Sequence, residues 1–136
     1  MGYEPLILLD THALIWWATE SSSLSGRARS AIERARNTSG FAVSAITFLE
    51  VATLVRRGRL DLGVPLADWV GDVGRISGLR IEPVTAAIAQ MAGSLGDAFP
   101  GDPIDRVIAA TAIGLQARLV TADQKLRAAP RLRTLW

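Results

Sequence analysis

The chain has 136 residues and a mass of 14.5 kDa, with 49% hydrophobic residues, 21% charged residues and a net charge of +2 at pH 7. This length and composition predict one domain over residues 1–136 and exclude a disordered chain. The sequence contains no cysteine and one histidine, His12. These counts exclude a disulfide scaffold, a thiol nucleophile and a zinc site built on cysteines or several histidines.

Short apolar segments alternate with helical segments along the whole chain. We expect strands at residues 6–9, 41–43, 79–83 and 118–121, and a short edge strand at residues 134–136. We expect helices that begin near residues 10–11 and 123, and helices over residues 25–36, 44–57, 65–76, 85–95 and 103–115. This alternation predicts a three-layer α/β/α sandwich with a mainly parallel central sheet. Ligands of such folds bind beyond the carboxyl ends of the strands, so acidic residues at those ends are candidates for a site.

The N-terminal segment and the apolar stretches bear on the location of the protein. Residues 1–9 lack the basic region and the long apolar region of a signal peptide. The most apolar long stretch, residues 41–55, is interrupted by Glu50 and is too short to span a bilayer. We therefore expect a cytoplasmic protein with no membrane association.

Two aspartates lie at or just beyond the ends of predicted strands. Asp10 comes after Leu9, and Asp123 comes two residues after the strand that ends at Thr121. Either side chain could serve only as the N-cap of the helix that follows it, since aspartate is a favoured residue there. Neither position alone decides between a structural and a functional role.

Glu50 is harder to explain as a structural residue. It lies in the strongly apolar helix of residues 44–55, and no lysine or arginine lies within one helical turn of it. An ionised carboxylate that is buried without a partner costs several kcal/mol. Glu50 therefore lies either on a helix edge that faces water or against a metal ion.

Asp102 and Asp105 lie three residues apart around Pro103. Asp102 is well placed to cap the helix that begins at Pro103, and Asp105 falls in the first turn, where the helix dipole favours an acid. Both therefore have a structural explanation. The helix that follows is deeply apolar, however, and in this type of fold its N-terminus points toward the strand ends.

Taken together, the acids suggest a metal site. Side chains that offer only carboxylate oxygens suit a hard divalent cation such as Mg²⁺ or Mn²⁺. Without a cation the acids would repel one another, and at least one pKa would rise. The rest of the chain has fifteen basic and nine acidic residues, a balance of +6 that suits a polyanionic partner. The members of this set are Asp10, Glu50, Asp105 and Asp123.

Four motifs in this order resemble the PIN (PilT N-terminus) domain family, and most closely its VapC-type toxins from prokaryotic toxin–antitoxin pairs. The motifs are LLDTHALIW at residues 8–16, SAITFLE at 44–50, DPIDRVIAATA at 102–112 and LVTAD at 119–123. Many members of this branch carry a histidine five residues before the third acid, where this chain has Pro100. No role of that histidine is carried over.

The resemblance implies a metal-dependent endoribonuclease that hydrolyses RNA phosphodiester bonds and is inhibited by a cognate antitoxin. It implies that Asp10, Glu50, Asp105 and Asp123 are catalytic and hold Mg²⁺ or Mn²⁺, and that the chain forms a homodimer. Thr11 and Thr121 match small polar positions that support such a site, and Asp102 is a further supporting candidate. Arg106 could contact RNA phosphate or could pair with an acid such as Asp102.

Two other readings of the sequence remain open. A phosphatase of the haloacid dehalogenase type also begins with an aspartate after a strand, but it needs a second aspartate where this chain has His12. A catalytically silent module with the same fold could bind RNA or protein, although such a module would not need Glu50 in an apolar helix. We expect His12 to be structural. Of the adjacent Trp16 and Trp17, we expect one to lie in the core and one on a partner surface.

Overall fold

In the computed structural model, which describes residues 5–136, five strands form one sheet in the order β3-β2-β1-β4-β5. All neighbouring strands are parallel, with Leu8 of β1 paired to Ala42 of β2 and to Leu119 of β4. The strands are β1 Ile7–Leu9, β2 Phe41–Ser44, β3 Leu79–Glu82, β4 Arg118–Val120 and β5 Thr134–Leu135. The predicted sheet is confirmed, including the short edge strand near the C-terminus. Residues 1–4, where a signal peptide would begin, lie outside the described residues.

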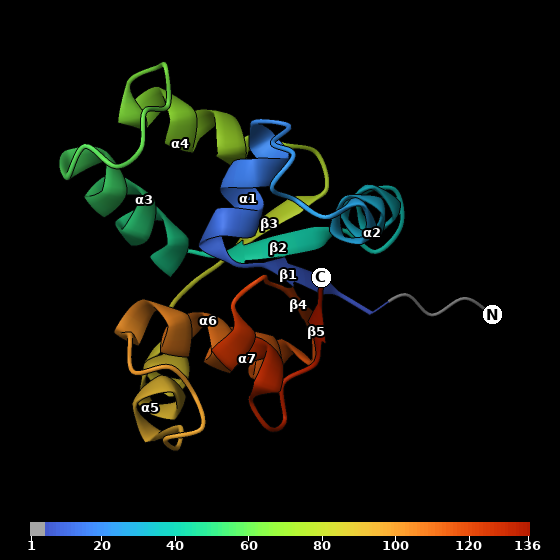
Figure 1. The fold of residues 1–136 in the computed structure, drawn as a ribbon, viewed down its shortest axis with the longest axis vertical. Helices are drawn as coiled ribbons and strands as arrows, with labels where there is room; N and C mark the ends of the chain where they lie inside the picture. The colour runs from blue at the N-terminus through green and yellow to red at the C-terminus, as the bar shows by residue number, and fades with distance from the viewer. Residues whose placement is uncertain (1–4) are drawn as a thin grey trace.

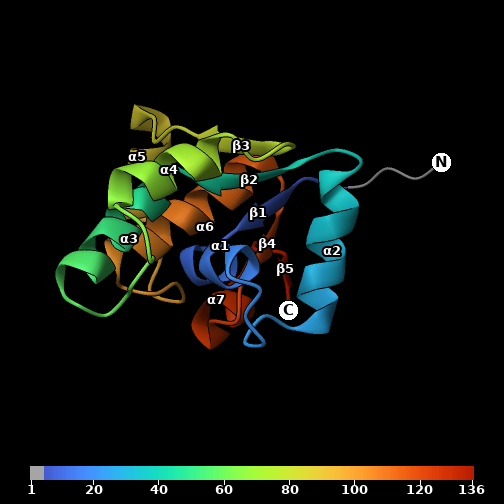
Figure 2. The ribbon, with the colours of Figure 1, turned by 90° about the horizontal axis from the view of Figure 1, so that it is seen from above.

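Helices cover both faces of this sheet, which confirms the three-layer architecture (Figure 1). The helices of the first layer are α1 Thr11–Ala18, α2 Gly26–Arg36, α3 Ile46–Arg56 and α4 Leu66–Gly74. Those of the second layer are α5 Ala86–Ser94, α6 Pro103–Leu115 and α7 Gln124–Ala128. Figure 2, seen from above, shows α1 in front of β1 and β4. No helix within residues 5–136 is long and apolar enough to cross a membrane.

The two faces of the sheet belong to two separate cores because successive strand residues point in opposite directions. Ile7 and Leu9 pack into the core under the first layer, whereas Leu8 packs into the core under the second. In the same way, Val120 and Leu119 of β4 serve opposite cores. Strands β1, β2 and β4 are therefore apolar on both sides, as buried parallel strands require.

Most helices begin at a polar cap that the sequence indicates. The side chains of these caps accept a hydrogen bond from a backbone N–H in the first turn, which satisfies one of the unpaired donors at a helix start. The caps are Asp10 for α1, Ser25 for α2, Thr85 for α5, Asp102 for α6 and Asp123 for α7.

Two predicted helix starts are wrong by about one residue. Ser44 remains in β2, and α3 begins after Ala45, which makes no side-chain cap bond. The Ser44 hydroxyl instead accepts a 3.1 Å hydrogen bond from the Ile46 N–H. Pro65 is the N-cap of α4 rather than a residue of its first turn. Both positions lie where a strand or loop continues further than local propensity suggests.

The parallel sheet determines where the candidate acids lie. Strands β1, β2 and β4 run in the same direction, so their carboxyl ends lie at one edge of the sheet. Asp10 directly follows β1, and its N–H donates a 3.1 Å hydrogen bond to the Val120 carbonyl of β4. Helix α3, which carries Glu50, begins beyond the same end of β2.

Candidate functional site

Four carboxylates from different parts of the chain line one cavity at the carboxyl ends of the strands. Asp10 comes from the start of α1, Glu50 from α3, Asp105 from the first turn of α6, and Asp123 from the start of α7. The cavity has a volume of about 380 Å³. Its remaining lining residues are His12, Trp16 and Ala122. The four acids that the sequence singled out therefore meet in space.

Asp10 is the most buried of these acids, with 9% of its surface exposed. Its carboxylate accepts a 2.9 Å hydrogen bond from the Ala13 N–H and a second bond from the side chain of Thr121. Burial raises the pKa of Asp10, and the nearby Glu50 raises it further, while the two hydrogen bonds and His12 oppose the rise. A proton or a cation at Asp10 would relieve this cost.

Thr121 connects two of the acids. It is completely buried, and its hydroxyl accepts a 3.0 Å hydrogen bond from the Asp123 N–H in addition to its contact with Asp10. The exposed Asp123 carboxylate in turn accepts a 2.9 Å bond from the Leu126 N–H. One hydroxyl thus fixes the Asp10 carboxylate and the backbone that carries Asp123.

Glu50 lies half-buried on α3, beside the exposed Leu49. Among the described residues it forms no ion pair, as its apolar neighbourhood predicted. A buried 3.2 Å hydrogen bond from the Thr11 hydroxyl to that of Thr47 joins α1 to the first turn of α3. Thr11 therefore has the supporting position expected of it, and Thr47 is a supporting residue that the sequence did not indicate.

Asp105 shows how strongly the acids interact. Partial burial raises the pKa of Asp105 to about 7, with further increases from the charges of Asp102, Glu50, Asp123 and Asp10, in that order. Asp102 is exposed and caps α6, accepting hydrogen bonds of 2.7 Å from the Ile104 N–H and 3.4 Å from the Asp105 N–H. Its negative charge therefore acts on Asp105 from just outside the cavity.

The donor set of this cavity fits a hard divalent cation because it offers carboxylate oxygens that repel one another when ionised. Across residues 5–136, however, no three acidic or histidine side chains are close enough together to hold an ion as they stand. Rotation of the side chains would have to bring the carboxylates of the cavity onto a bound ion.

The aromatic side of the cavity differs from what the sequence predicted. His12, which we expected to be structural, is exposed and lines the cavity. Neither adjacent tryptophan lies in the core interior, since both are half-buried. Trp17 packs its ring edge against Phe41, whereas Trp16 lines the acidic cavity. The apolar sequence of α1 does not show which side of the helix meets the cavity, so this role of Trp16 was missed.

Arg106 has a structural role rather than the role in RNA contact or acid pairing considered for it. Its Nε donates a 2.9 Å hydrogen bond to the Ala92 carbonyl, and its Nη1 a 3.0 Å bond to the Pro100 carbonyl. Its Nη2 donates to the Leu95 carbonyl. All three guanidinium nitrogens thus fix the segment between α5 and α6, and we no longer assign Arg106 to RNA.

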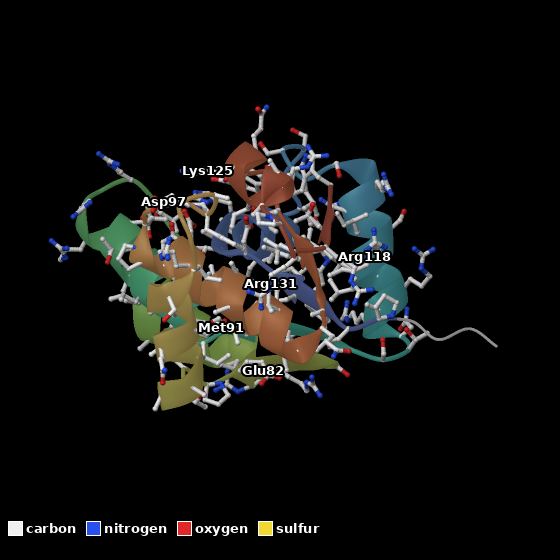
Figure 3. All side chains as sticks on the ribbon, turned by 90° about the horizontal axis from the view of Figure 1, so that it is seen from below. Glu82, Met91, Asp97, Arg118, Lys125 and Arg131 are labelled. Atoms are coloured by element: carbon white, nitrogen blue, oxygen red, sulfur yellow. The ribbon has the colours of Figure 1, made fainter. Side chains whose placement is uncertain are left out.

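Five of the fifteen basic residues lie in the C-terminal part of the chain, from Arg118 onward. Figure 3 labels Arg118 of β4, Lys125 of α7 and Arg131 of the segment before β5. Lys125 and Arg131 are exposed, as is Arg127 of α7. Lys125 and Arg127 both lie on α7, the helix that Asp123 caps.

The sequence model of one family matches nearly the whole described chain. The PIN domain model matches residues 7–132. The chain is a member of the PIN domain family. The match includes all four acids of the cavity, and the haloacid dehalogenase reading is therefore set aside.

Known proteins similar to this chain include a curated relative and several solved structures. The chain is 40% identical to Ribonuclease VapC22 of Mycobacterium tuberculosis over 132 residues, which are 96% of this chain and 98% of the relative. The structure of VapBC2 from Rickettsia felis, bound to a DNA fragment from its promoter, has a TM-score of 0.70 at 19% identity, with 96% of this chain and 97% of that chain covered. M. tuberculosis VapC20, described as a Sarcin-Ricin loop cleaving toxin, has a TM-score of 0.63 at 18% identity, with coverage of 93% and 98%. The solved structures support the fold.

Proposed function

We propose that this chain is the toxin of a toxin–antitoxin pair, a divalent-metal-dependent endoribonuclease that hydrolyses RNA phosphodiester bonds and is inhibited by a cognate antitoxin. The observation that carries this proposal is the meeting of four carboxylates in one cavity of a PIN domain. The 40% identity to a curated ribonuclease over nearly the full length supports the same reaction. Since the proposed substrate is cellular RNA, the proposal includes a cytoplasmic location for the activity.

The carboxylates of the cavity would hold the metal. A bound divalent ion supplies positive charge for the phosphate and a water of lowered pKa for the attack. Asp10, Glu50, Asp105 and Asp123 offer the oxygens, and Thr121 orients the first of them through its buried hydroxyl. Mg²⁺ and Mn²⁺ both suit such a donor set. The basic residues of α7 would attract the RNA backbone toward this acidic cavity.

Two protein partners belong to the proposal. A cognate antitoxin is supported by the toxin–antitoxin complexes among the similar structures, including one from Klebsiella pneumoniae. A homodimer is supported by exposed apolar side chains at and beyond the edge strand β3, since Ile81 and Val84 are 41% and 38% exposed. Sedimentation of the purified chain with and without Ile81→Lys would test the dimer.

An RNA cleavage assay tests the enzyme activity. The chain, purified free of antitoxin, would be incubated with transfer, ribosomal and messenger RNA in Mg²⁺ or Mn²⁺, with and without EDTA. We expect cleavage that EDTA abolishes, and that Asp10→Asn reduces by at least about 100-fold because a metal-bound water supplies several kcal/mol of the rate. No cleavage of any RNA would instead favour a catalytically silent binding module. Undiminished cleavage by Asp10→Asn and Asp105→Asn would remove the assigned site.

A further inference from the structure

Trp16 is a large aromatic side chain in the wall of the acidic cavity. It lies on α1, six residues after Asp10, and lines the same cavity as the four carboxylates. Its side chain is half-buried, so part of the indole remains open at the cavity. None of the roles assigned to the carboxylates explains why a tryptophan should lie there.

Two other aromatic rings hold this indole in place. The ring of Trp136, which follows β5, lies 5.8 Å from the Trp16 ring between centroids, with 58° between the planes. The imidazole of His12, itself in the cavity lining, lies 5.6 Å from the same ring at 50°. A side chain packed in this way from two elements loses little conformational freedom when a ligand binds.

The indole N–H of Trp16 has no hydrogen-bond acceptor among residues 5–136. Its neighbour Trp17 differs, since its N–H donates a 2.8 Å bond to Glu33 and its ring packs against Phe41. Trp69 differs as well, because it is only 8% exposed and packs in the core. Trp16 therefore combines a fixed ring, a free donor and a place beside the carboxylates.

The carboxylates around Trp16 limit what the exposed part of its indole can bind. Four carboxylates line the cavity, so an anionic group is repelled except where a cation neutralises them. An uncharged flat ring has no such limit and can stack on an indole. In RNA such a ring is attached through the sugar to each phosphate, and an unpaired base is free to turn onto an aromatic side chain.

We infer that Trp16 is a stacking platform for an unpaired nucleobase next to the phosphate that is cleaved at the carboxylate site. The inference rests on the proposed RNA substrate and adds a requirement to it: the substrate must present an unstacked base at the cleavage site. RNA in a loop or a single strand meets this requirement, whereas a continuous duplex does not.

Binding to base-deleted RNA tests the platform. The full chain, as wild type, Trp16→Phe and Trp16→Leu, would be titrated in Ca²⁺, which neutralises the carboxylates, with a fluorescein-labelled single-stranded oligonucleotide of mixed sequence. Parallel titrations would use the same oligonucleotide with one base removed at each position in turn. We expect Trp16→Phe to bind within about 3-fold of the wild type and Trp16→Leu to bind about 5- to 100-fold more weakly, the range for loss of one base–aromatic stack.

The base deletions separate stacking from a general loss of structure. At one position, base removal should weaken wild-type binding by a similar factor and leave Trp16→Leu binding unchanged. Trp17→Phe, which changes a tryptophan outside the cavity lining, should bind like the wild type. Equal affinity of Trp16→Leu and the wild type, or no binding by the wild type, overturns the inference. A loss of RNA affinity in Trp16→Leu also overturns the inference if no single base removal reproduces it in the wild type.

Cleavage in Mn²⁺ distinguishes failure of the platform from failure of the ribonuclease proposal. RNA cleavage by Trp16→Leu with unchanged KM and kcat would reject the platform and leave the enzyme in place. Base-dependent binding without cleavage of any RNA would keep the platform and reject the enzyme. If the platform and the ribonuclease activity are both correct, Trp16→Leu should raise the KM for RNA by about 5- to 100-fold, the same factor as for binding.

Discussion

The hydroxyl of Thr11 donates a buried 3.2 Å hydrogen bond to the hydroxyl of Thr47, and this bond joins the start of α1 to the start of α3. Thr11 is next to Asp10, and Thr47 lies about one turn before Glu50, so the bond helps to set the distance between two acids of the cavity. Both threonines are at most 1% exposed. Water cannot replace either partner without a change in packing.

Thr47→Val should destabilise the protein by about 1–3 kcal/mol, because it leaves the Thr11 hydroxyl buried without a partner. The double variant Thr11→Val, Thr47→Val removes both polar groups and should recover most of that loss. Urea unfolding of the wild type, both single variants and the double variant measures the coupling. Additive effects of the two substitutions would show that the bond contributes nothing specific.

Thr121→Val should impair the site more than the fold. It removes the hydroxyl that holds the Asp10 carboxylate and the Asp123 backbone, while it preserves the shape of a fully buried side chain. We expect a loss of about 10- to 100-fold in Mn²⁺ affinity or in RNA cleavage, as for other residues that orient metal ligands. Isothermal titration with Mn²⁺ and the cleavage assay measure both. Thr121→Ser keeps the hydroxyl and should stay close to the wild type.

The raised pKa of Asp105 predicts how stability depends on pH without metal. The pKa is about 7 in the folded protein and 3.8 in the reference state, so between these values the folded protein binds more protons than the unfolded chain. Its free energy of unfolding should therefore fall as pH rises from about 4 to about 7. Asp10, whose pKa is also raised, contributes with the same sign.

Urea unfolding in EDTA across this pH range measures the effect, and Asp105→Asn is the matched control. The difference between the wild type and Asp105→Asn isolates the contribution of this one carboxyl group. A difference that stays constant from pH 4 to pH 8 would contradict the assigned pKa.

Asp105→Asn should also raise the melting temperature at pH 8 in EDTA. The substitution removes the repulsion from four neighbouring acids, although it gives up about 0.3–1 kcal/mol of favourable interaction with the helix dipole. A net gain of about 1 kcal/mol corresponds to about 3–6 °C for a chain of this size. Saturating Mn²⁺ should reverse the order, since it stabilises the wild type and not a variant that lacks a ligand. Calorimetry with and without Mn²⁺ shows whether the reversal occurs.

Arg106→Gln should destabilise the fold without weakening RNA binding by the folded protein. The substitution removes guanidinium bonds to the carbonyls of Ala92, Leu95 and Pro100, and we expect a cost of at least about 2 kcal/mol. Thermal unfolding gives the cost, and a titration with labelled RNA well below the melting temperature gives the affinity. A large loss of affinity at full folding would restore Arg106 as an RNA contact.

Local chemistry made much of this structure predictable. Asp102 followed by Pro103 marks the start of α6, and the predicted bounds of that helix are correct. The meeting of the acids followed from strand direction, since residues after parallel strands lie at one edge of the sheet. The start of α3 was less predictable, because Ser44 has the character of a helix cap and yet pairs in β2.

Contacts between distant segments were not predictable in the same way. Arg106 donates to backbone carbonyls, which no side-chain pattern in the sequence identifies. Trp16 lies in a helix that is apolar on nearly every side, so periodicity could not orient it. Thr47 gained its role only when α1 and α3 packed together.

The sheet separates two hydrophobic cores, and the acids of the cavity come from helices on both sides of it. Asp10 and Glu50 belong to helices of one layer, and Asp105 and Asp123 to helices of the other. An ion bound by all four carboxylates would link the two helical layers across the sheet. Local unfolding of one layer would then require loss of the ion's contacts with the other. Amide hydrogen exchange in α1 and α6 should accordingly slow together when Mn²⁺ is added, as a signature that the two halves have become one cooperative unit.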